Sequence, residues 1–236
     1  MTKKLTKKYG FWKSFFISFS VVCLTVALLF SVAIAFYPGG NFKFRDQEGY
    51  SFLWGAMTDL GAPISINGEP NPISQALYRT GMTMISVIVT TFFAIIWIFF
   101  QERKSTKIFS IIGTALGVIQ GIAFLGVGYT LGGDLHLIFL VTAPLVEFFA
   151  ILSYAIVFTI DKRITKISRY TFWIMFSSSL FYVSFVIIGL FIGGDFEMII
   201  RHACHTVFNF CVLTGYFITG IGMYLFIRRQ EQVIEN

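Results

Sequence analysis

Six long apolar runs follow one another along the 236-residue chain and constrain its fold more than any other feature. Each contains about 20 or more residues, enough for an α-helix to cross roughly 30 Å of hydrocarbon. Helices and closed barrels are the structures that satisfy every backbone hydrogen bond inside a membrane. The pattern therefore predicts an all-α polytopic membrane protein, with residues 1–236 forming one domain of six transmembrane helices. The predicted spans are residues 15–37, 81–100, 108–131, 135–160, 170–192 and 199–227.

The composition agrees with this class of protein. Charged residues make up 13% of the chain and hydrophobic residues 56%, whereas roughly 25% of the residues in ordinary soluble domains are charged. The net charge of +6 comes mainly from short basic clusters between the spans. Such clusters orient membrane proteins, and we therefore expect no nucleic-acid partner.

Lysine and arginine are distributed unequally between the two ends of the predicted bundle. Fourteen of the 18 lie at the N-terminus, in residues 102–107 and 161–169, and at Arg228 and Arg229. The other four are Lys43, Arg45, Arg79 and Arg201. Because basic residues concentrate on the cytoplasmic side, we expect both termini in the cytoplasm and residues 38–80 outside it. The cell membrane is the expected location.

The predicted outer loop, residues 38–80, is the one long polar interruption in this apolar chain. It contains several prolines together with Asp59 and Arg79. We expect it to form an ordered lid over the outer end of the bundle.

Three polar side chains, Gln120, Glu147 and Asn209, fall near the middle of predicted spans. Ionisable groups at this depth are costly and usually face the interior of a bundle. Glu147 is therefore a candidate functional residue. A purely structural alternative is a neutral Glu147 that hydrogen-bonds to Gln120 or Asn209.

All three histidines lie near the predicted outer face. His136 and Glu147 are eleven residues apart, and His202, His205 and Asn209 follow a three-and-four spacing, so each set shares one helix face. If the two faces meet, they form a polar funnel that opens outward. The candidate ligand-binding residues are Asp59, Arg79, Gln120, Asp134, His136, Glu147, Arg201, His202, His205 and Asn209.

Three functions remain open for such a funnel. Aromatic residues and exposed cations favour the binding or organisation of lipid or a lipid-like ligand. A lipid hydrolase is the second, with Zn²⁺ on His136, His202 and His205 and with Asp59 or Glu147 as general base. A proton- or cation-coupled transporter that uses Glu147 is the third. The sequence does not decide whether the protein is an enzyme.

The third predicted span carries Gly113, Gly117 and Gly121 at four-residue spacing. Glycine stripes let membrane helices approach closely. We expect this face to pack against another helix, either within the bundle or in a homo-oligomer.

Two short motifs in the predicted outer loop carry a family resemblance: T-D-L-G at residues 58–61 and N-P-I-S at residues 71–74. The loop resembles the (S/T)-D-L-G … N-P-x-S pattern of a bacterial and archaeal six-span membrane family of unknown function, and Thr58 stands where serine is commoner. That family is similar to the eukaryotic DRAM/FRAG/Sfk-like proteins. The resemblance implies six helices, cytoplasmic termini and roles that involve lipids, such as GPI-anchor remodelling, autophagy modulation and membrane lipid organisation.

Overall fold

The computed structural model describes residues 3–130 and 132–235, and these residues confirm an all-helical chain. Within them, six helical segments are long and apolar enough to cross a membrane, as expected for an integral membrane protein. The segments are α1 (Lys3–Ala35), α2 (Pro72–Ile96) with the 3₁₀ turn η2 (Trp97–Phe100), α3 (Lys104–Tyr129), α4 (Gly133–Ile160), α5 (Lys166–Ile192), and a continuous run of α6 (Gly194–Ile199), the π-helical η3 (Ile200–Cys204) and α7 (His205–Glu235).

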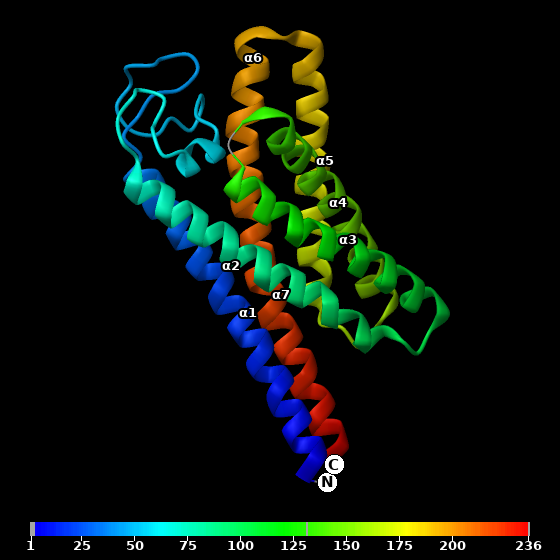
Figure 1. Cartoon of the computed structure of the whole chain (residues 1–236). Helices are drawn as coiled ribbons and strands as arrows, with labels where there is room; N and C mark the ends of the chain where they lie inside the picture. Colours follow the sequence, from blue (N-terminus) through cyan, green and yellow to red (C-terminus); the bar gives the residue numbers. More distant parts are fainter. Residues whose placement is uncertain (1–2, 131, 236) are drawn as a thin grey trace.

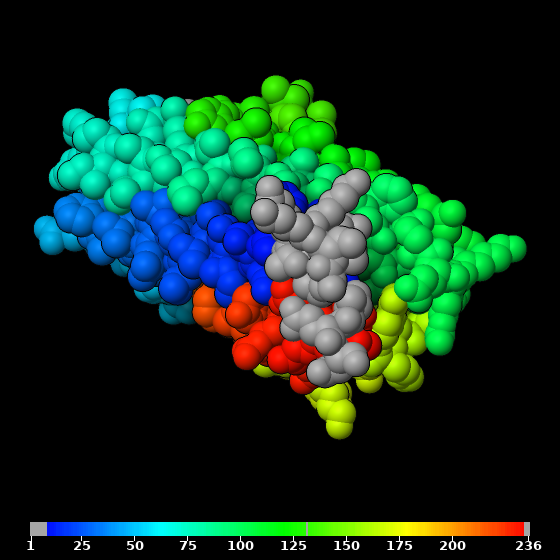
Figure 2. All heavy atoms as spheres, turned by 90° about the horizontal axis from the view of Figure 1, so that it is seen from below, coloured from blue at the N-terminus to red at the C-terminus, as the bar shows by residue number. Residues whose placement is uncertain are grey.

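The six segments form a closed ring in which each helix packs on the next and α7 returns to α1. Both termini lie side by side at one end of the bundle, which we call the terminal end (Figure 1). There Lys13 Nζ is 2.6 Å from Glu231 Oε2 and joins α1 to α7. Seen from below in Figure 2, the blue of α1 adjoins the red of α7. The opposite end, the loop end, carries residues 36–71, which we call the α1–α2 segment.

Aromatic side chains fill the ring on the side of the terminal end. Phe19 of α1 stacks on Phe92 of α2 with ring centroids 4.5 Å apart. Phe93 and Tyr154 extend this cluster toward α4, with ring centroids 5.5 Å apart. All four side chains have no exposed surface. The terminal half of the ring is therefore a packed core.

The second span begins earlier than the sequence predicted. Helix α2 starts at Pro72, so residues 72–80 of the predicted loop are helical and the predicted start at Gly81 is wrong. Proline is favoured in the first helical turn because that turn has no use for its missing N–H. The 3₁₀ turn η1 (Met57–Gly61) lies inside the remaining segment. Leu131, the predicted end of the third span, lies outside the described residues.

The glycine stripe on α3 packs against two other helices of the same chain. A Cβ at Gly113 would lie 2.7 Å from Cδ2 of Tyr154 in α4, and one at Gly117 would overlap the ring of Phe93 in α2. A Cβ at Gly121 would overlap the Thr90 hydroxyl, also in α2. All three glycines are buried. This face packs on α2 and α4 within the chain.

We expect Gly117→Ala to lower the thermal unfolding midpoint of the detergent-purified protein, because the added methyl group overpacks the contact with Phe93. Overpacking of this kind costs about 1–3 kcal/mol. The matched control is Gly10→Ala in α1, where a Cβ meets nothing within 4 Å. Equal midpoints for the two variants would contradict this account of the helix contact.

Candidate functional site

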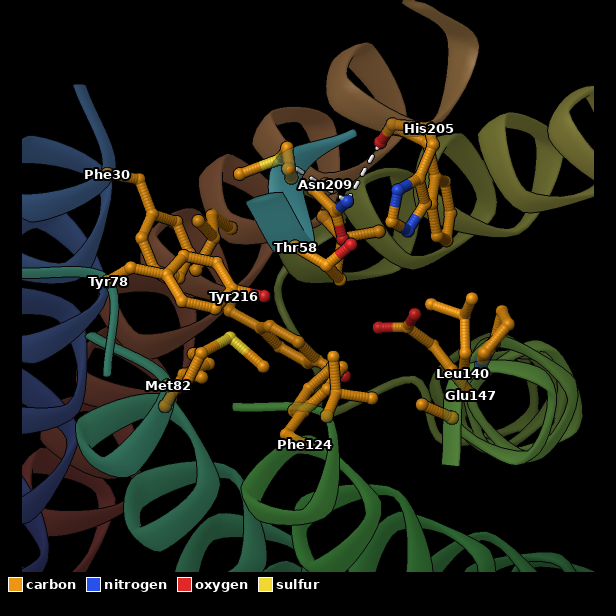
Figure 3. A pocket seen from close by; sticks show the side chains of 18 residues that line it. Phe30, Thr58, Tyr78, Met82, Phe124, Leu140, Glu147, His205, Asn209 and Tyr216 are labelled. Atoms are coloured by element: carbon orange, nitrogen blue, oxygen red, sulfur yellow. Dashed lines mark hydrogen bonds between the residues drawn. The ribbon is translucent and has the colours of Figure 1, made fainter. Parts of the chain in front are cut away.

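A cavity lies inside the loop end of the ring, bordered by η1 and by every helix of the ring except α5 (Figure 3). Its volume is about 60 Å³, whereas a single water needs roughly 10–15 Å³. Most of its wall is apolar. The lining residues are Phe30, Met57, Thr58, Tyr78, Met82, Ile85, Phe124, Val127, Leu140, Ala143, Pro144, Glu147, His205, Phe208, Asn209, Val212, Leu213 and Tyr216.

Glu147 is the one acidic residue among those lining the cavity. Its side chain comes from α4, is 2% exposed, and points its carboxyl group into the cavity (Figure 3). Oε1 accepts a hydrogen bond of 2.6 Å from Nε2 of Gln120. Within residues 3–130 and 132–235, no donor is hydrogen-bonded to Oε2 and no Lys or Arg is paired with Glu147. One oxygen is thus held and the other is free.

Gln120 connects Glu147 to the far side of the ring. Its amide lies in α3 with no exposed surface and also donates to Oη of Tyr216 in α7, at 3.2 Å. Tyr216 Oη in turn lies 3.4 Å from Oε1 of Gln120. Of the two partners that the structural alternative offered for Glu147, Gln120 forms the hydrogen bond and Asn209 does not. Tyr216, which is not among the predicted residues, joins this network.

Helix α7 brings two predicted residues to the cavity, His205 and Asn209. The His205 ring lies against Tyr182 of α5, with ring centroids 5.5 Å apart. Asn209 Nδ2 donates to the backbone carbonyl of His205 at 2.9 Å and contacts the Met57 sulfur at 3.6 Å. Asn209 therefore faces η1 and does not pair with Glu147.

The α1–α2 segment covers the cavity through η1, which contributes Met57 and Thr58 to the wall. Asn71 holds η1 in place, because its Nδ2 donates to the carbonyls of Leu60 and Ala62 at 3.1 and 2.9 Å. The segment also reaches α7, where Tyr50 Oη lies 3.4 Å from Thr206 Oγ1. The N-P-I-S motif thus has a structural role in fixing η1.

Asp59 lies next to the cavity, but its carboxylate turns back onto its own segment. Oδ2 accepts a hydrogen bond of 3.0 Å from the backbone N–H of Ala56. Burial raises the pKa of Asp59 from its ordinary value of 3.8 to about 6, and the hydrogen bond from Ala56 opposes this rise. The carboxylate caps η1.

The three histidines do not share one funnel. His136 is outside the cavity lining, and its Nδ1 lies 3.1 Å from Thr130 Oγ1. His202 is 7% exposed and lies beside the ring of Phe42, with centroids 6.1 Å apart. Among the residues that the structure describes, no three His, Cys, Asp or Glu side chains come together as a metal site. The predicted grouping of His136, His202 and His205 is not present.

The remaining predicted residues lie outside the cavity. The Arg79 guanidinium carbon is 5.7 Å from the centre of the Tyr129 ring. Arg201 pairs with Glu197 one helical turn earlier. Asp134 is exposed in the first turn of α4. None of these three lines the cavity.

Several lining residues that the sequence did not predict follow the same helical spacing as the predicted ones. On α7, the residues His205, Asn209, Val212 and Tyr216 recur at intervals of three and four. On α4, Leu140 and Pro144 precede Glu147 on its own face. Extending the helical pattern from polar to apolar and aromatic positions would have identified them.

Comparisons of the chain with protein-family models, curated proteins and solved structures found no match.

We expect Asp59→Asn to raise stability at pH 7.5, because asparagine retains an acceptor for the Ala56 N–H and removes a buried charge. The folded-state pKa of about 6 exceeds the ordinary value of 3.8, so ionisation opposes folding as pH rises through this range. The gain should be about 1–3 kcal/mol at pH 7.5 and vanish near pH 4. Thermal unfolding of both proteins across pH measures it, and a gain that does not change with pH would contradict this assignment.

Proposed function

We propose that the protein is an integral protein of the cell membrane that binds lipid or a lipid-like ligand in the cavity around Glu147. The observation that carries this proposal is a largely apolar cavity into which one buried carboxyl group points with a free oxygen. Ligand sites are commonly apolar hollows with a few polar groups that orient the ligand. A molecule with an apolar body and a small polar group matches that wall.

The distribution of basic residues supports an orientation for this site. Both termini lie at the same end of the bundle, and the basic clusters at residues 102–107 and 161–169 adjoin turns at that end. We propose that this terminal end is cytoplasmic. The α1–α2 segment and the cavity beneath it then face the outside of the cell. The expectation that residues 38–80 are extracytoplasmic becomes, with α2 starting at Pro72, a proposal for residues 36–71.

The packed terminal half of the ring favours binding over transport. Between Glu147 and the terminal end, the interior is filled by aromatic side chains with no exposed surface, including Phe19, Phe92 and Phe93. A coupled transporter needs a route from its central carboxylate to both sides of the membrane. The cavity in this structure ends at the aromatic cluster.

The hydrolase alternative receives no support from the geometry, because the three histidines have separate surroundings. Zinc chemistry also needs several ligands around one point. The resemblance of the 58–61 and 71–74 motifs to a family with lipid-related roles stays a prediction in favour of lipid binding.

The test is to purify the protein in mild detergent and quantify tightly bound lipids by mass spectrometry. Ala143→Phe places a ring in the cavity, since Ala143 lines it and is 4% exposed. We expect bound lipid per protein to fall about tenfold, which corresponds to a loss of roughly 1.4 kcal/mol.

The matched control is Val141→Phe, which adds a ring on the same helix at a position that is 55% exposed. We expect it to retain the bound lipid. If both variants carry as much lipid as the unchanged protein, or if no lipid is retained by any of them, the cavity is not a lipid site.

A further inference from the structure

We propose that the cavity selects a single-chain amphiphile whose polar group is an ammonium, recognised by the free oxygen of Glu147. This inference rests on the proposed function and names the ligand class of the same site. It is carried by the position of the carboxyl group, by the other acceptors around it, and by the rings that complete the wall.

The charge of the lining favours a cation. Glu147 is acidic, and none of the 18 lining residues is Lys or Arg. The ion pairs of the described chain lie elsewhere, as with Lys13 and Glu231 at the terminal end. A buried carboxylate without a cationic partner is costly, and a bound ammonium would supply that partner. An anionic head group would meet the same carboxylate, and among the lining residues only the imidazole of His205 could offset it.

The wall offers several hydrogen-bond acceptors, and the hydroxyls of Thr58 and Tyr78, which can donate or accept, also line it. Glu147 Oε2 accepts no hydrogen bond from the described residues. Pro144 has no N–H to donate to the carbonyl of Leu140, four residues earlier, and both residues line the cavity. Asn209 uses its amide N–H₂ on the His205 carbonyl and directs no donor toward Glu147. A primary ammonium has three N–H donors and matches this set.

Aromatic rings add a second attraction for a cation. Phe124 and Tyr216 lie near Glu147 in Figure 3, and Phe30 and Tyr78 form the wall opposite. A cation within about 6 Å of a ring face gains roughly 0.5–2 kcal/mol. The cavity volume of about 60 Å³ leaves room for a head group with the start of one chain.

The experiment compares three probes with the same C12 alkyl chain: dodecylamine, dodecanol and dodecanoate. Their radiolabelled forms are equilibrated with the protein in phosphatidylcholine nanodiscs, and binding to empty nanodiscs is subtracted. We expect dodecylamine to bind at least about tenfold more tightly than the other two, because its contact with a carboxylate is charge-assisted.

Glu147→Gln keeps the shape of the side chain and removes its charge. We expect this variant to lose about tenfold or more in dodecylamine affinity, while dodecanol binding changes by less than about twofold. The matched control is Asp134→Asn, which removes an exposed carboxylate from the same helix and should leave all three affinities unchanged. Retained dodecanol binding also shows that Glu147→Gln is folded.

The comparison of probes on the unchanged protein is decisive without any variant. Equal affinities for the amine and the carboxylate would overturn the ammonium assignment and leave lipid binding in place. A preference for dodecylamine that persists in Glu147→Gln would overturn the role of Glu147. If none of the three probes binds and no lipid is retained on purification, the proposed function fails together with this inference.

Discussion

The hydrogen bond between Gln120 and Glu147 is the interaction on which the loop half of the bundle depends. A carboxyl group inside an apolar ring needs a partner, because an unsatisfied polar group there costs several kcal/mol. Gln120 supplies that partner at 2.6 Å and donates at the same time to Tyr216 across the ring. Three helices, α3, α4 and α7, are thereby held at one separation. On the loop side of this network the ring encloses the cavity, whose wall is mostly apolar.

The roof of the cavity is fixed by a separate set of contacts. Inside the α1–α2 segment, Asn41 Oδ1 accepts from the backbone N–H of Phe44 at 2.8 Å, and Asn71 holds η1. Buried backbone groups need such partners wherever a chain is neither helix nor sheet. Helix α7 meets both sets, through Thr206 at the roof and Tyr216 at the floor. The shape of the cavity therefore depends on how α7 is placed in the ring.

The sequence predicted those parts of the fold that depend only on the order and polarity of residues along the chain. Apolarity and length located the six spans, and the depth of polar groups within the spans gave Gln120 and Asn209 as alternative partners of Glu147, of which Gln120 forms the bond. The start of α2 was missed because the polar residues before Gly81 concealed a helix that Pro72 begins. The glycine stripe was correctly expected to allow close packing, but which neighbour it meets depends on the order of helices around the ring.

The described residues do not bring the three histidines together as a metal site, for a related reason. Residue spacing tells which side chains share a helix face, and it does not tell what lies opposite that face. His136 meets Thr130, at the end of the preceding helix, and is not among the residues that line the cavity. The spacing of the three histidines could not predict the hydrogen bond of His136 or the ring contacts of His202 and His205.

The π-helical turn at Ile200–Cys204 explains why His202 and His205 diverge. A π turn takes more residues than an α turn, so the helix after it is rotated relative to the helix before it. His202 consequently lies beside Phe42 of the α1–α2 segment, while His205 lines the cavity. The same rotation sets the face on which Asn209 and Tyr216 follow. Insertions of this kind occur frequently at functional sites, and here the residues that follow the insertion on one face of α7, His205, Asn209 and Tyr216, line the cavity.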